Sequence, residues 1–119
     1  AVVNERYRYI WNLTPEVEFK NAVNNQKNGG TAWFKSWKTK AENDNIASEL
    51  LWKYRKRPKE ELYDIKKDKW CQNNLAAKPE FEAIKKQLRS ELLKWMEMCG
   101  DKGQQTEMEA FEHMPRHNK

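Results

Sequence analysis

Cysteine and histidine are scarce in this chain, which has 119 residues and contains two of each. Cys71 and Cys99 are too few to define a disulfide framework, and their spacing matches no metal-binding motif. His113 and His117 have the spacing of a helical zinc pair, but Pro115 lies between them and would break the helix that such a pair needs. We therefore expect no metal site in this chain.

Long apolar runs are also absent. No stretch approaches the roughly 20 residues of a membrane-spanning helix, and no signal peptide is recognisable. Ile, Leu, Val and Phe make up only 20 of the 119 residues, which, with a net charge of +5, would ordinarily indicate disorder. Six Trp, four Tyr and four Phe offset this shortage, because aromatic side chains bury large apolar areas. The composition predicts a folded unit with a small core, whose large side chains partly serve a surface shared with another part of a longer protein.

Two segments have the alternation of β-strands. Val2 and Val3 precede a polar turn, and residues 6–11 then alternate, which predicts a hairpin with Tyr7, Tyr9 and Trp11 on one face. Residues 61–65 predict another short strand. The hairpin begins at the first residue, so we expect the chain to start within an element, as a fragment would.

The clearest helix pattern lies in the C-terminal third. Pro79 occupies the first position of a helix that is expected to run to about Met98, acids follow in its first turn, and Gly100 ends it. Its apolar stripe predicts one buried face, formed by Phe81, Ile84, Leu88, Leu92 and Trp95. Residues 101–119 are expected to be a polar, partly mobile tail, in which residues 106–113 have the pattern of a short amphipathic helix.

Helical patterns also occupy the middle of the chain. Residues 14–31 predict a long polar loop, and residues 33–37 form a short apolar helical face. A second helix is expected from about Ala41 to Tyr54 and is stopped by Pro58. Its predicted buried face consists of Ile46, Ala47, Leu50, Leu51 and Tyr54. These patterns predict an α+β fold: a small antiparallel sheet, a long C-terminal amphipathic helix packed on one face, and a second shorter helix.

Several short motifs resemble the C-terminal region of sulfatases. They are the strand Arg6–Ile10, the stretch Arg57–Ile65, the turn with Lys67-Asp68, the segment Asn73–Ala76 and the helix end at Trp95-Met96. Residues 100–104 and 106–109 are similar to the tail of bacterial members. The resemblance covers residues 1–119 and is strongest to the heparan N-sulfatase (sulfamidase) group. The chain departs from the family pattern at Lys69 and Cys71, where Asp-Pro and then an acid are usual, and at Lys78, where an Asp cap is common.

The resemblance implies what this chain does and what it lacks. Sulfatases hydrolyse sulfate esters or sulfamates with a formylglycine made in a Cys/Ser-x-Pro-x-Arg motif, together with a calcium ion. Neither Cys71 nor Cys99 lies in that motif, so the resemblance places catalysis in an upstream domain of the same polypeptide and leaves no catalytic or metal-binding residue here. The two cysteines are expected to be free, buried thiols. The parent enzyme is expected to be periplasmic or extracellular and to act on a sulfated glycan.

Basic residues before Pro58 are the candidate substrate-framing site. They are Lys53, Arg55, Lys56 and Arg57. Arginine forks match sulfate oxygens as they match phosphate oxygens. The alternative is a solvated helix end, where cations complement the helix dipole and Arg57 pairs with Glu60 or Glu61. The neighbouring aromatic side chains of residues 33–37 would either stack on sugar rings or pack against a core.

Two other functions fit the composition. A basic chain with interleaved aromatics is compatible with a nucleic-acid-binding module, but acids are interspersed throughout and no recognition motif occurs. We therefore expect no nucleic-acid partner. A stand-alone protein-interaction domain is the other alternative.

Overall fold

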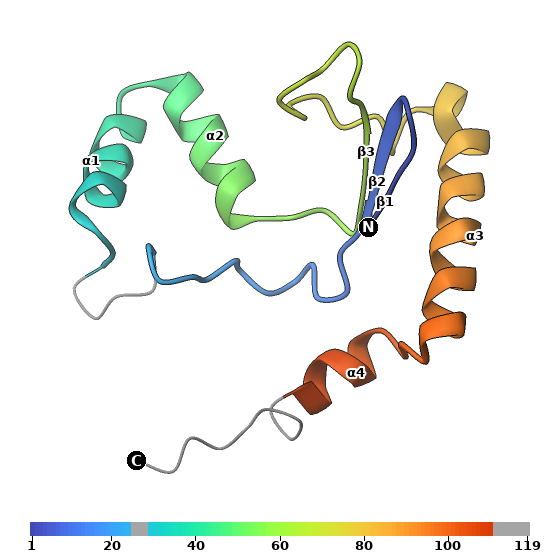
Figure 1. Ribbon diagram of the computed structural model, residues 1–119. Coiled ribbons are helices and arrows are strands. Elements are labelled where there is room, and N and C mark those ends of the chain that lie inside the picture. Colours follow the sequence, from blue (N-terminus) through green and yellow to red (C-terminus); the bar gives the residue numbers. More distant parts are fainter. Residues whose placement is uncertain (25–28, 111–119) are drawn as a thin grey trace. The chain divides into compact units, whose positions relative to one another are not determined.

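The computed structural model describes residues 1–24 and 29–110, and the chain divides into two compact units (Figure 1). Residues 1–13 and those from 59 onward form the first, which we call the sheet unit. Residues 14–58 form the second, which we call the helical unit. The helical unit is therefore an insertion in the sequence between two strands of the sheet unit.

The sheet unit contains a three-stranded antiparallel sheet. The strands are β1 (Val2–Val3), β2 (Tyr7–Trp11) and β3 (Glu60–Asp64), in the order β1-β2-β3. The side chain of Asn4 closes the first turn, because its Oδ1 accepts the backbone N–H groups of Arg6 at 2.9 Å and Tyr7 at 2.7 Å. The predicted hairpin and the second strand are confirmed, and Tyr9 lies opposite Leu62 in the register.

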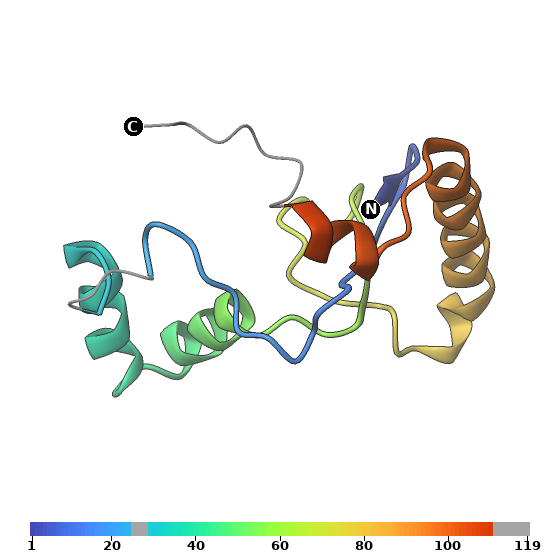
Figure 2. The ribbon, with the colours of Figure 1, turned by 90° about the horizontal axis from the view of Figure 1, so that it is seen from below.

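One long helix covers the face of this sheet that carries the aromatic side chains. A short 3₁₀ turn (Pro79–Phe81) leads into α3 (Glu82–Cys99), and Gly100 ends the helix in the left-handed conformation with φ of 71°. The helix runs alongside the strands in both views (Figures 1 and 2). Tyr9, Leu62 and Leu88 are the largest fully buried side chains. The α+β fold with a long C-terminal helix on a small antiparallel sheet is therefore confirmed.

The prediction that Trp95 belongs to the buried face of this helix is wrong. Met96 is buried, with 8% of its surface exposed, whereas Trp95 is 57% exposed. The buried side chains at this end therefore follow the i, i+4 row Leu88, Leu92 and Met96, which winds slowly around a helix of 3.6 residues per turn, and not the i, i+3 step from Leu92 to Trp95. Beyond Gly100, the chain places Gly103 against Met96 and then forms α4 (Gln104–Glu109), on which Met108 is 70% exposed. Phe111, His113 and His117 lie outside the described residues.

The helical unit is built from α1 (Ala32–Ala41) and α2 (Asn45–Arg55). Asp44 caps α2, since its side chain accepts the N–H of Ala47 at 2.8 Å, and α2 therefore begins later than the sequence pattern predicted. The rings of Phe34, Trp37 and Tyr54 lie within 5.5–6.3 Å of one another and form an aromatic core. Ala47 and Leu51 are also buried.

The predicted buried face of α2 is confirmed for Ala47 and Leu51 and is wrong for two other residues. Ile46 is 73% exposed and Leu50 is 38% exposed. Consecutive residues of a helix are about 100° apart, so Ile46 and Leu50 both lie well around the helix from the buried Leu51. The structure bears out the end of the helix: Lys56 is already extended, two residues before Pro58.

Candidate functional site

The basic segment Lys53–Arg57 lies at the C-terminal end of α2. Two of its cations are neutralised within the helical unit: the Lys53 amine is 2.7 Å from Glu49 Oε1, and the Arg55 guanidinium donates to the Glu18 carboxylate. The hydrogen bond from Arg55 lowers the pKa of Glu18, so the pair is ionised at neutral pH. Within the described residues, Lys56 and Arg57 are in no salt bridge.

Arg57 is held by an aromatic ring. Its guanidinium carbon lies 3.7 Å from the centroid of Phe19, and the backbone N–H of Phe19 donates to the carbonyl of Arg55 at 2.9 Å. Stacking of a guanidinium on a ring fixes its plane while its N–H donors point outward in that plane. Glu60, which the sequence offered as a partner for Arg57, instead accepts a bond from Arg89 at 2.9 Å. Arg57 is therefore exposed, and the ring of Phe19 orients its guanidinium.

The connecting segment before α1 is tied to the end of α2. Besides Glu18 and Phe19, Asn21 donates from its side-chain amide to the hydroxyl of Tyr54 at 2.9 Å, and the rings of Phe19 and Tyr54 are in edge contact at 5.6 Å. The loop predicted for residues 14–31 is thus ordered along its first part by α2. Of the three aromatic side chains of α1, Phe34 is buried and Trp37 is half-buried, whereas Trp33 is 54% exposed.

The sulfatase-like motif in and after β3 builds the backbone turn. The carboxylate of Asp64 is buried and accepts the N–H groups of Lys66 and Lys67, both at 3.2 Å, and a salt bridge from Arg6 at 3.0 Å. Burial acts to raise the pKa of Asp64, but the Arg6 bond and the two N–H groups outweigh it and lower that pKa. Asp64 is therefore an architectural carboxylate.

The side chain of Asn74 also accepts backbone N–H groups, at the outer edge of β3. Its Oδ1 accepts the N–H groups of Leu62 at 2.9 Å and Ala76 at 3.0 Å, and its amide donates to the carbonyl of Glu60 at 3.1 Å. The N–H of Leu75 donates to the carbonyl of Leu62 at 2.8 Å. Leu62 therefore has both backbone groups paired on the side of the strand that faces away from β2.

A charged network joins the sheet to α3. Glu60 Oε1 accepts the hydroxyl of Tyr9 at 2.7 Å and Arg89 at 2.9 Å, and the Lys85 amine lies 3.9 Å from Oε2. Burial favours a higher pKa for Glu60, but the bonds from Tyr9 and Arg89 outweigh it and lower the pKa. Burial and the ionised Glu60 raise the pKa of Tyr9. These groups therefore form a fixed structural pairing.

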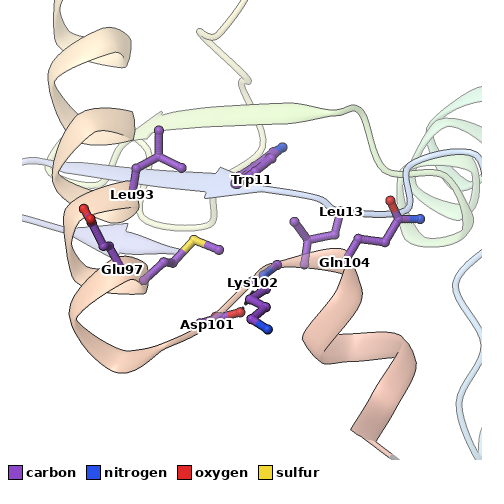
Figure 3. Close-up of a pocket in the computed structure, with 9 residues that line it drawn as sticks. Trp11, Leu13, Leu93, Glu97, Asp101, Lys102 and Gln104 are labelled. Carbon is purple, nitrogen blue, oxygen red and sulfur yellow. Dashed lines mark hydrogen bonds between the residues drawn. The ribbon is translucent and has the colours of Figure 1, made fainter.

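A shallow pocket of about 450 Å³ lies at the end of α3 in the sheet unit (Figure 3). Its apolar lining is formed by Trp11, Leu13, Leu93 and Met96, and its polar lining includes Glu97, Asp101, Lys102 and Gln104. Two carboxylates and one amine line it, so the pocket is poorly suited to a sulfate group.

Neither cysteine is in a disulfide. Cys99 is exposed and Cys71 is half-buried, so the prediction of two buried thiols is wrong, most clearly for Cys99 at the solvent-facing end of α3. In the described parts of the chain, no group of three or more His, Cys, Asp or Glu side chains could hold a metal ion. Neither cysteine lies in the formylglycine motif of sulfatases, and the described residues offer no cluster of side chains for a calcium ion. No helix within residues 1–24 and 29–110 is long and apolar enough to cross a membrane.

Comparison with known proteins supports a relationship to sulfatases. The chain is 31% identical over 111 residues, 93% of its length, to an ulvan-active sulfatase of Formosa agariphila. It is 40% identical over 48 residues to another match with the same name from that organism. The chain spans 18% of the length of the first protein, and the aligned part is 10% of the second. No family model matches the chain.

The exposed turn after β3 is a candidate site that the sequence pattern does not single out. In the sequence it stands out only as the turn with Lys67-Asp68 of the sulfatase-like pattern, although Trp70 in it is 74% exposed. The sequence feature that could have indicated this turn is Trp70 beside Lys69, where the chain departs from the usual sulfatase pattern.

Proposed function

We propose that this chain is the C-terminal subdomain of a sulfatase that acts on a sulfated glycan, and that its basic segment helps to hold the substrate. The observation that carries the proposal is the match over 93% of the chain to an ulvan-active sulfatase. The side chains of Asp64 and Asn74, at the end of β3 and beside it, support a structural role, because they accept backbone N–H groups. Neither residue belongs to the formylglycine motif.

Arg57 and Lys56 are the residues that we assign to substrate framing. Arg57 is oriented by Phe19, and Lys56 is exposed beside it in sequence. Arg55 and Lys53 act as positioning residues, since each is paired with an acid of the helical unit. An exposed ion pair contributes only about 0–1 kcal/mol, whereas a bidentate arginine in a partly closed site contributes more.

The substrate is proposed at the level of sulfated glycans. The motifs resemble heparan N-sulfatases, but the matched proteins are named ulvan-active sulfatases and give no support to a heparan N-sulfatase specificity. Calcium and formylglycine belong, in this proposal, to an upstream catalytic domain of the same polypeptide, and that polypeptide is periplasmic or extracellular.

The test uses the longer enzyme that contains this chain. Lys56→Gln with Arg57→Gln should raise KM on a sulfated oligosaccharide several-fold and leave kinetics on a small aryl sulfate unchanged, because the lost contacts are remote from the reacting sulfur. Arg55→Gln should show a smaller effect of the same kind. A matched control, Lys20→Gln with Lys35→Gln, removes the same charge from exposed sites in the same unit. Equal kinetics for the Lys56/Arg57 variant and the enzyme without substitutions on both substrates, at unaltered stability, would refute substrate framing.

A further inference from the structure

The turn after β3 exposes an indole among lysines. Lys66, Lys67 and Lys69 are all exposed, and Trp70 is 74% exposed. None of the three amines is in a salt bridge with another described residue. The Lys69 amine lies 5.1 Å from the centre of the Trp70 ring. Cationic groups and a flat apolar ring therefore occupy the same short turn.

A fourth cation approaches the turn from the sheet. Arg8 on β2 is exposed, and its Nη1 lies 3.6 Å from the Sγ of Cys71, the residue that follows Trp70. Four cations and the carboxylate of Asp68 leave a net charge of +3. We call this set the basic tryptophan surface: Arg8, Lys66, Lys67, Lys69 and Trp70.

The backbone that carries these side chains is held at both ends. The N–H of Asp68 donates to the carbonyl of Asp64 at 2.7 Å, and the two carboxylate oxygens of Asp68 accept the N–H groups of Gln72 at 3.0 Å and Asn73 at 2.7 Å. The carbonyl of Trp70 accepts the side-chain amide of Gln72 at 2.9 Å. The acid of this turn is thus engaged with backbone N–H groups, and the lysine side chains and the indole are exposed to solvent.

We propose that the basic tryptophan surface is a binding site for a sulfated polysaccharide, in addition to the basic segment at the end of α2. The apolar C–H face of a pyranose ring packs on an exposed indole, and ammonium and guanidinium groups bind sulfate oxygens. Five consecutive residues span at most roughly 17 Å even when extended, so the ring and the lysine amines can contact neighbouring sugars of one chain. This surface would hold the polymer while the parent enzyme acts on it.

A glycan fits this surface better than a nucleic acid does. Proteins that bind single-stranded nucleic acid stack successive bases on several aromatic side chains along a basic groove, whereas this turn presents one indole. The choice of a sulfated ligand rests on the proposed function. Binding is measured here without turnover, so failure at this surface and failure of the sulfatase assignment are distinguishable.

The experiment measures the affinity of the whole 119-residue chain for ulvan and for chemically desulfated ulvan, at about 0.15 M salt. Trp70→Ala should weaken binding to ulvan about fivefold or more, because the stacking platform is lost. The triple variant Lys66→Gln, Lys67→Gln, Lys69→Gln should weaken it about tenfold or more and reduce its salt dependence. Desulfated ulvan should bind more weakly than ulvan.

Matched controls separate this site from general charge and exposed aromatics. Trp52→Ala removes an indole that is 62% exposed on α2, and Lys35→Gln with Lys78→Gln and Lys94→Gln removes the same charge from other exposed positions. Each should change affinity less than about twofold. Circular dichroism establishes that every variant is folded. The proposal fails if ulvan does not bind, if the control triple variant loses as much affinity, or if Trp70→Ala weakens binding to single-stranded DNA but not to ulvan.

Discussion

Leu88 and Trp95, two large side chains on α3, differ sharply in what their removal should cost. Leu88 is 1% exposed between α3 and the sheet, whereas Trp95 is 57% exposed. Leu88→Ala should lower the free energy of unfolding by about 2–5 kcal/mol, since it removes a buried side chain and leaves a cavity. Trp95→Ala should cost less than about 1 kcal/mol. Urea denaturation followed by circular dichroism compares the two, and equal costs would contradict the assigned core.

The stability of the chain should depend on the ionisation of Glu60. Its pKa is lowered in the folded state, because bonds from Tyr9 and Arg89 outweigh the effect of burial. The stabilisation is therefore present above the titration range of an unfolded glutamate, about pH 4.3, and is lost as pH falls through the lower folded pKa.

Glu60→Gln should make stability less dependent on pH between about pH 5 and pH 3. Urea midpoints across this range measure the slope. Glu5→Gln, an exposed change in the first turn, is the control and should keep the slope of the unsubstituted chain. An unchanged slope in Glu60→Gln would show that this carboxylate does not contribute to acid sensitivity.

Among the elements, the outer edge of β3 depends on one amide side chain, that of Asn74. Asn74→Ala should destabilise the chain by about 1–3 kcal/mol, because the N–H groups of Leu62 and Ala76 lose their acceptor. The adjacent Asn73→Ala is the matched control, since Asn73 takes part in the turn through its backbone N–H and is exposed. Thermal unfolding of both variants tests this, and a similar melting temperature for the two would rule out this role of the Asn74 side chain.

Strands and helices could be predicted from the sequence because their periodicity is local. The alternation of residues 6–11 and the stripe through Leu88 and Leu92 reflect which face each element buries, and the structure confirms both. Trp95 and Ile46 were misplaced because periodicity does not reveal how far the partner surface extends. Both side chains belong to the predicted stripes, yet more than half of the surface of each is exposed.

Individual side-chain contacts could not be predicted from the sequence pattern. Arg57 rests on Phe19, and Asp68 accepts backbone N–H groups of its own turn. Local charge alone offered Glu60 as a partner for Arg57. The resemblance to sulfatases indicated the turn after β3. Only the hydrogen bonds of Asp64, Asp68 and Asn74 show that these three side chains hold its backbone and the edge of β3.

At the scale of the whole molecule, the chain should lack sulfatase activity on its own. Neither cysteine lies in a formylglycine motif, and the described residues contain no cluster suited to a metal ion. Purified chain should therefore hydrolyse neither an aryl sulfate nor a sulfated glucosamine, with or without added calcium. Release of sulfate is measured against a buffer control in a preparation free of other sulfatases. Turnover above that control would overturn the assignment of catalysis to another part of the protein.

The insertion of the helical unit between β2 and β3 also has a kinetic consequence. Asn12 and Glu61, which are joined by a side-chain hydrogen bond, are 49 residues apart in the chain, whereas β1 pairs with β2 across a short turn. Closing a long loop costs chain entropy before its contacts form, so the pairing of β2 with β3 should be the slow event in folding. The backbone bond from Asn12 to Lys59 lies where the insertion begins and ends. Prior folding of residues 14–58 would shorten the effective loop, so the inserted segment would accelerate assembly of the sheet that it interrupts.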